Sequence, residues 1–183
     1  MDTDKVILGV DPGTTIMGYG IIQIKNKKMF LINMGILHLS KLKSHELKLR
    51  KIFERLLQII DEYKPDELAI EAPFYGKNVQ SMLKLGRAQG VAMAAALYRD
   101  IPIFEYAPKK IKMSITGNGN SSKEQVCKML QSILKIKDMP KHLDASDGLA
   151  AAVCHHFQRN NSKINKNYSS WKKFINDNPG KVK

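Results

Sequence analysis

The order of apolar patterns along this chain predicts a layered α/β fold. Five runs are short and apolar or alternating, as strands are: Lys5 to Val10, Tyr19 to Ile24, Met29 to Leu39, Asp66 to Glu71 and Ile103 to Tyr106. The first three follow one another without a helical pattern between them, whereas the last two alternate with helical segments. A hairpin-linked antiparallel portion with a parallel extension predicts one mixed sheet with helices outside it.

Four segments have the residue spacing of helices: Glu46 to Tyr63, Lys77 to Arg99, Ser122 to Leu134 and Asp144 to Phe157. The first carries a continuous apolar stripe at steps of three and four residues. The second is rich in small residues, such as Gly86 and Gly90, which would let either the sheet or a partner subunit approach closely. Before the third helix we predict a basic segment, Pro108 to Ile115, and a glycine-rich loop.

The charge of the chain indicates a polyanionic partner. Lysine and arginine number 30 against 17 acidic residues, which gives a net charge of +13. Such an excess favours nucleic acid over a neutral metabolite. From Gln158 onward there are seven basic residues and one acid, yet the rest of the chain is basic too. We expect a domain at residues 1–158 and a basic tail at residues 159–183.

The sequence also predicts a cellular location. No apolar run reaches the roughly 18 residues that a membrane helix needs, and the start lacks the pattern of a secretory signal. Cys127 and Cys154 form neither a CxxC pair nor a disulfide framework. These features predict a cytoplasmic protein with reduced thiols and no membrane association.

Four acidic residues stand where a metal-dependent nuclease would need them. Asp11 and Glu71 each end a predicted strand, and open α/β sheets place ligands beyond the carboxyl ends of their strands. Asp144 and Asp147 are three residues apart at a helix start, so their Cβ atoms lie about 5–6 Å apart on one face. Carboxylates are the ligands that Mg²⁺ prefers. Two such ions can activate a water and stabilise the leaving oxygen in phosphodiester cleavage.

Each acid also has a structural explanation. Aspartate before Pro-Gly commonly forms a side-chain turn, which would account for Asp11. Glu71 could be an ordinary charge at a strand end. Asp144 fits a helix N-cap, and Asp147 fits the acidic third position of a helix. Taken singly these positions favour structural roles, and only the joint pattern favours catalysis.

The motifs around these acids resemble those of the RuvC family of Holliday junction resolvases. The matching segments occur in the family's order: Ile7 to Thr14 with Gly18-Tyr19-Gly20, Ala69 to Glu71 followed by Phe74, Lys77 and Asn78, Leu83 to Gly90, Phe104 to Pro108, and Asp144 to Ala150. The resemblance covers roughly Val6 to His156. It implies an RNase H-like layered fold, with a mixed five-stranded sheet and helices on both faces.

The same resemblance implies the chemistry of the site. The family's four metal-binding acids correspond to Asp11, Glu71, Asp144 and Asp147, which would hold two Mg²⁺ ions that Mn²⁺ could replace. The family similarity further implies a homodimer that nicks two strands of like polarity in a four-way DNA junction. The products would carry 5′-phosphates and 3′-hydroxyls, and the RuvA–RuvB branch-migration complex would be a partner.

Basic and aromatic residues near the acids are candidates for DNA binding. Those that flank the glycine-rich loop or follow Glu71 are Lys109, Lys112, Lys123, Lys77, Lys84 and Arg87. Lysines on a helix face are usually only solvated, but this grouping favours contacts with phosphates. In the family, the positions of Lys112 and Lys123 are associated with DNA binding. Phe74 either packs in the core or, as the resemblance suggests, stacks on an unpaired base.

Three other functions compete with junction resolution. Asp11-Pro12-Gly13-Thr14-Thr15 also resembles the first phosphate loop of actin-like and heat-shock-chaperone ATPases, but those proteins need two such domains. A non-catalytic nucleic-acid-binding module would gain nothing from four acids that repel phosphates. An RNase H-like nuclease for another branched or RNA-containing substrate would share the chemistry, and competition between substrates would separate the two.

Overall fold

The computed structural model describes residues 4–73, 78–137 and 143–164, with side chains described up to Arg159. Its elements, in chain order, are β1 (Lys5–Asp11), β2 (Ile16–Lys25), β3 (Lys28–His38), α1 (His45–Tyr63), β4 (Glu67–Glu71), α2 (Val79–Leu97), β5 (Ile103–Tyr106), α3 (Pro108–Thr116), α4 (Lys123–Leu134) and α5 (Asp144–Ile164). The strands form one sheet in the order β3-β2-β1-β4-β5. β1 pairs antiparallel with β2 and parallel with β4, so the sheet is mixed, as predicted.

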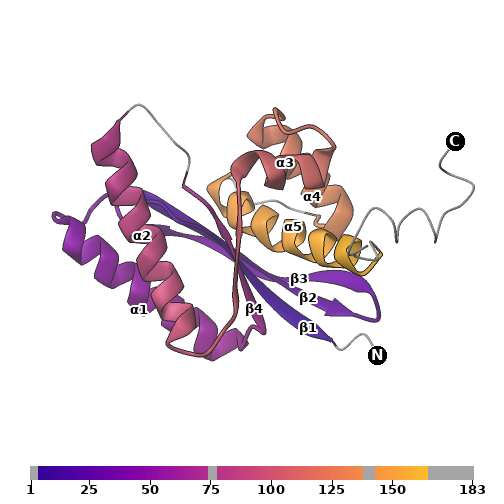
Figure 1. Ribbon diagram of the computed structural model, residues 1–183, viewed down its shortest axis with the longest axis horizontal. Helices are drawn as coiled ribbons and strands as arrows, with labels where there is room; N and C mark the ends of the chain where they lie inside the picture. The colour runs from indigo at the N-terminus through magenta and orange to yellow at the C-terminus, as the bar shows by residue number, and fades with distance from the viewer. Residues whose placement is uncertain (1–3, 74–77, 138–142, 165–183) are drawn as a thin grey trace, which may run out of the picture.

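Helices cover both faces of this sheet. Figure 1 shows α1 and α2 on one face and α5, with α3 and α4 beside it, on the other. The fold is therefore the predicted α/β, RNase H-like arrangement of a five-stranded mixed sheet between helical layers. Among the described residues, no helix is both long enough and apolar enough to span a membrane.

Alternation along the strands divides the core into two layers. On β1 and β4, Leu8, Val10, Leu68 and Ile70 pack in the cluster that contains α1 and α2. The residues between them face α5, where Ile7 and Ala69 belong to the second cluster. Because side chains alternate along a strand, the last residues of both strands, Asp11 and Glu71, also point toward the α5 face.

Glycines let α5 lie directly on the sheet. A Cβ at Gly9 would come within 2.1 Å of the Gly148 carbonyl oxygen, and one at Gly20 within 2.4 Å of the Leu149 Cα. A Cβ at Gly148 would in turn meet the Tyr19 Cα at 2.5 Å. Side chains at these positions would push α5 away, so the glycines fix its height above β1 and β2.

Three details differ from the sequence predictions. The basic segment after β5 is a helix, α3, which begins at Pro108 and ends in a left-handed residue, Gly117, with φ of 75°. Proline suits the first helical position because the amide hydrogen that it lacks would be unpaired there. α5 begins at Asp144 itself, so Asp144 is not the N-cap residue that the sequence suggested. α5 also continues past Phe157, where the sequence predicted its end, to Ile164.

Candidate active site

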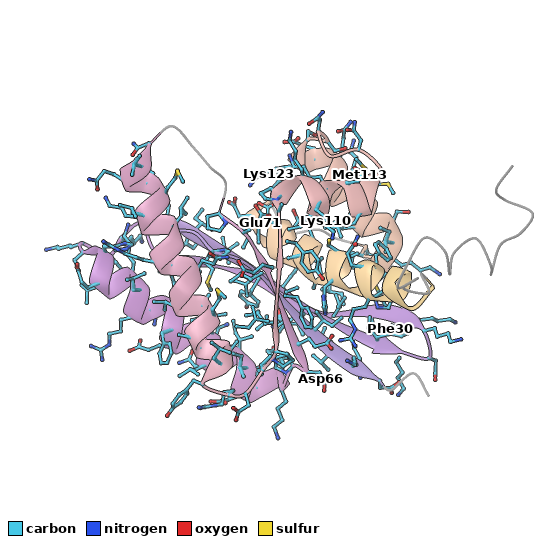
Figure 2. The ribbon with its side chains drawn as sticks, in the orientation of Figure 1. Phe30, Asp66, Glu71, Lys110, Met113 and Lys123 are labelled. Carbon is cyan, nitrogen blue, oxygen red and sulfur yellow. The ribbon has the colours of Figure 1, made fainter. Side chains whose placement is uncertain are left out.

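Asp11 and Glu71 lie side by side at the carboxyl end of the sheet. The parallel register pairs Val10 with Ile70, so the next residue on each strand comes at the same level. Both side chains are partly buried. Figure 2 shows Glu71 at the same end of the molecule as Lys123, whereas Asp66, just before β4, lies at the opposite end.

The first turn of α5 brings Asp144 and Asp147 to the same end. Asp11 pairs with Gly18 on β2, and a Cβ at Gly18 would lie only 2.0 Å from the Asp144 carbonyl oxygen. The glycine therefore lets the start of α5 lie over the end of β1. Three of the four acids, Asp11, Glu71 and Asp147, line one pocket. Asp144 lies at its margin with its side chain 39% exposed.

A helical wall closes the other side of this pocket. It is formed by α3 and α4, which contribute the cations Lys112 and Lys123 and an apolar surface of Pro108, Ile111 and Val126, while Ala150 of α5 completes the lining. The pocket thus places three carboxylates opposite two ammonium groups. Such an arrangement suits a phosphodiester, because cations attract its phosphate and a carboxylate-bound metal can assist its cleavage.

The acids strongly perturb one another. Burial, followed by repulsion from Asp147, raises the pKa of Asp11 to about 7. Burial, followed by repulsion from Asp11 and Asp147, raises the pKa of Glu71 to about 8. The pKa of Asp147 is also raised, chiefly by burial. Negative charge is therefore concentrated here and incompletely neutralised, as it is in sites that bind cations.

Lys123 supplies part of the missing positive charge. Its Nζ donates to the Asp147 Oδ2 at 2.5 Å and to the Asp144 Oδ1 at 3.3 Å. The capping box of Ser122 and Gln125 holds the α4 start, and with it Lys123, in place. Although burial opposes it, bonding to these carboxylates raises the pKa of Lys123 above its usual range, so the side chain remains a cation.

The donor chemistry fits a hard divalent cation, but the donors are not preassembled around one. Among the described side chains, no three carboxylate, imidazole or thiolate groups converge closely enough to hold a metal ion as they stand. Asp11, Glu71 and Asp147 nevertheless line one pocket, and small side-chain rotations would bring these neighbouring carboxylates onto an ion.

The remaining predicted site residues lie at different distances from the acids. Lys112 lines the pocket, and Lys109 is exposed on the same helix. Lys84 and Arg87 are exposed on α2, the helix that covers the opposite face of the sheet. Phe74 and Lys77 lie outside the described residues.

Sequence reasoning did not find Gln89, which lies beside the acids. Its side chain is 8% exposed and, with Leu85, lines a second pocket that reaches Asp11 and Glu71 from the α2 side. The Gln89 Nε2 donates to the Glu105 Oε2 at 2.8 Å. A polar residue within the alanine-rich part of α2 was the signal that could have identified it.

Several known proteins with similar sequences belong to one family. The profile of the family described as crossover junction endodeoxyribonuclease RuvC matches residues 7–155. A RuvC of Bacteroides fragilis is 64% identical over 98% of this chain and 97% of its own length. One from Christiangramia forsetii is 62% identical over 100% of this chain and 95% of its own length.

A solved structure gives the same result. The RuvC of T. thermophilus in complex with a Holliday junction substrate superposes with a TM-score of 0.80 at 28% identity, over 86% of this chain and 96% of that one. The sequence and fold similarities both extend over most of the chain. This chain belongs to the RuvC family of crossover junction endodeoxyribonucleases.

Proposed function

We propose that this protein resolves four-way DNA junctions by metal-dependent, symmetric nicks in two strands of like polarity, in homologous recombination and DNA repair. The observation that carries this proposal is the convergence of Asp11, Glu71 and Asp147 in one pocket opposite Lys112 and Lys123. Family membership supports the substrate, since the T. thermophilus relative was solved with a Holliday junction. The products carry 5′-phosphates and 3′-hydroxyls.

In this proposal Asp11, Glu71, Asp144 and Asp147 hold the metal, and two Mg²⁺ ions, replaceable by Mn²⁺, fit the oxygen donors. When bound, the ions activate a water and stabilise the leaving oxygen. Asp11 and Glu71 extend from the ends of neighbouring strands, so the sheet orients them. Asp144 and Asp147 extend from the start of α5, and Lys123, which pairs with both, would be free to contact a phosphate when they hold the metal.

Cations around the pocket would hold the DNA backbone. Lys112 and Lys123 are placed for the phosphates next to the cleaved bond, because they share the pocket with the acids. Lys109, Lys84 and Arg87 are exposed and would contact phosphates farther away. Such contacts position DNA without reading its sequence. Phe74 would stack on an unpaired base, and Lys77 would add a further phosphate contact.

An exposed stripe on α2 supports a homodimer. Val79 and Leu83 are 66% and 52% exposed, and Leu97 continues the stripe at 61%. Between them, a Cβ at Gly86 or Gly90 would meet nothing within 4 Å. These positions recur with helical periodicity, so a second α2 could pack closely along them. Two copies would supply the two active sites that paired nicks require.

Further features of the proposal remain predictions. A partnership with the RuvA–RuvB branch-migration complex follows from the family, and a cytoplasmic location follows from the sequence pattern. So does the division into a nuclease domain at residues 1–158 and a basic tail at residues 159–183. Because α5 continues to Ile164, a tail would begin more naturally after that residue.

The test is cleavage of a labelled synthetic four-way junction, beside a linear duplex and an RNA–DNA hybrid of the same sequence. We expect paired symmetric nicks in the junction only, dependent on Mg²⁺, and no cleavage by Asp11→Asn. Asp61→Asn, which changes a surface carboxylate on α1, serves as the matched control and should cleave normally. Junction binding without cleavage by the wild type would support a binding module, and preferential cleavage of the hybrid would change the substrate.

A further inference from the structure

A buried polar chain connects α5 to the sheet at the end opposite the acids. His155 on α5 is fully buried, and its Nε2 lies 2.9 Å from the Glu67 Oε2 at the start of β4. The other ring nitrogen, Nδ1, lies 2.7 Å from the hydroxyl of Tyr106 on β5. Glu67 is only 4% exposed.

The charges in this chain determine which atom donates. Lys5 lies 2.6 Å from the Glu67 Oε1, and Arg159 also pairs with that oxygen, so Glu67 is an anion that can only accept. Burial lowers the pKa of His155 to about 4, so the imidazole is neutral. The Nε2–H of His155 therefore donates to Glu67, and the Tyr106 hydroxyl donates to Nδ1. Each polar atom of the chain therefore has at least one partner that suits it.

The spacing of this chain matches the spacing of the acids. Asp147 and His155 are eight residues apart on α5, about 12 Å along a helix. Glu71 and Glu67 are four residues apart on β4, about 13 Å along a strand. α5 thus faces the same strand at two levels, with carboxylates at one level and a hydrogen-bonded pair at the other.

The interaction between α5 and β4 differs between the two levels. No hydrogen bond or ion pair joins Asp147 to Glu71 among the described contacts, so this level does not fasten α5 to the strand. The glycine contacts set the height of α5 above the sheet. Because they are non-directional van der Waals contacts, they oppose a shift of α5 along its own axis less well than hydrogen bonds do. The Glu67–His155–Tyr106 chain is attractive, buried and directional, and so is suited to fixing the axial position.

We propose that Glu67, His155 and Tyr106 are positioning residues for the nuclease site, because they set the register of α5, and with it Asp144 and Asp147, against the strand end that carries Glu71. None of the three touches the reacting atoms. Tyr106 is also the direct neighbour of Glu71 across the β4–β5 ladder, so the chain anchors both strands beside the site. The inference rests on the proposed metal-dependent cleavage.

The test compares Tyr106→Phe and Glu67→Gln with Ile59→Val. The first removes one hydroxyl and keeps the ring, and the second removes the charge and keeps the shape. Ile59→Val, which shortens a fully buried side chain of α1 in the other core layer, is the control for general destabilisation. Each is assayed well below its melting temperature for the Mg²⁺ dependence of junction cleavage and, without DNA, for Mn²⁺ binding by electron paramagnetic resonance.

We expect Tyr106→Phe and Glu67→Gln to need roughly tenfold more Mg²⁺ for half-maximal cleavage and to bind Mn²⁺ correspondingly more weakly, as when outer partners of metal ligands are lost. Ile59→Val should keep wild-type values of both. Wild-type metal dependence in either network variant, or an equal shift in Ile59→Val, overturns the positioning role. A wild-type protein that does not cleave junctions would instead overturn the proposed function, so the two failures are distinguishable.

Discussion

Asp11 and Glu71 destabilise the metal-free protein, because folding moves them into a region where ionisation is costly. The pKa of Asp11 rises from 3.8 to about 7, and that of Glu71 from 4.5 to about 8. When the folded-state pKa lies above the unfolded value, the carboxyl ionises at a lower pH in the unfolded chain, and this ionisation stabilises the unfolded chain relative to the folded one. Above the unfolded pKa, each carboxyl therefore lowers the free energy of unfolding. A cation that neutralised the carboxylates of Asp11 and Glu71 would remove this destabilisation.

Asp11→Asn should consequently stabilise the metal-free protein while abolishing cleavage. In EDTA at pH 8 we expect its free energy of unfolding, measured by urea denaturation, to rise by up to about 4 kcal/mol, because the pKa of Asp11 rises from 3.8 to about 7 and one pKa unit corresponds to about 1.4 kcal/mol. Asp61→Asn is the control of opposite sign, because the Arg99 guanidinium lowers the pKa of Asp61. A destabilised Asp11→Asn would show that Asp11 is held by favourable contacts and not by repulsion.

Lys112 is predicted to contact a phosphate. Lys112→Ala should weaken junction binding and reduce the slope of log K against log salt by about 0.9, the value for one phosphate contact. The control is Lys25→Ala, since Lys25 is exposed at the end of β2 farthest from Asp11. Binding is measured by fluorescence anisotropy in Ca²⁺, over a range of salt concentrations. An identical slope for Lys112→Ala and wild type would remove Lys112 from the DNA interface.

At the scale of the elements, some glycines are needed for packing inside this chain and others are not. Gly20 on β2 is required for contact, since a Cβ there would lie 2.4 Å from the Leu149 Cα. Gly86 on α2 is free of neighbours within the described residues of this chain, and glycine is a poor helix former. Gly86 therefore lowers the stability of α2 without relieving any contact inside this chain, which favours the proposal that a second copy packs against it.

Gly20→Ala should lower the free energy of unfolding by roughly 2 kcal/mol or more, because overpacking moves α5. Gly86→Ala should raise it by about 1 kcal/mol at concentrations where the chain is monomeric, as alanine favours a helix. The same Gly86→Ala change should weaken the dimer measured by sedimentation equilibrium. A dimer unaffected by that substitution would place the subunit interface elsewhere.

For the whole molecule, the site makes stability depend on pH and metal together. His155 has a folded-state pKa of about 4, below its ordinary 6.5, so it reduces stability only as the pH falls below 6.5. Between pH 6.5 and 8, His155 is mostly neutral in both the folded and the unfolded chain, so the pH dependence of stability there comes from the raised pKa values of Asp11 and Glu71. Stability from these two carboxyls falls as the pH rises through that window.

We therefore expect the melting temperature in EDTA to fall from pH 6.5 to pH 8, and excess Mg²⁺ to remove most of this fall. A proposed Mg²⁺ site present only in the folded protein would stabilise it by about 1.4 kcal/mol at tenfold excess of Mg²⁺ over its Kd. Glu71→Gln should flatten the pH dependence in EDTA. A wild-type melting temperature that ignores both pH and Mg²⁺ would contradict a clustered metal site.

The sequence predicted most strands and helices because these elements depend on patterns among residues that are close together in the chain. Strands such as Ile103 to Tyr106 and the helix beginning after Ser122 were predicted closely, since alternation, apolar periodicity and capping act over a few residues. The helix at Pro108 was missed, because its basic surface hid a short apolar face formed by Ile111 and Ile115. Asp11 and Glu71 were placed together because parallel strands carry their carboxyl ends to one edge.

Only the tertiary structure decided which groups meet across the molecule. The ion pairs of Lys123 with Asp144 and Asp147 join residues more than 20 positions apart, and the pair of His155 with Glu67 joins residues 88 positions apart. Burial in this packing also keeps the His155 imidazole neutral. The sequence by itself determined the elements and the acids, through spacing and residue type. Their partners, charges and exact register depend on how α5 packs on the sheet, which no local pattern encodes.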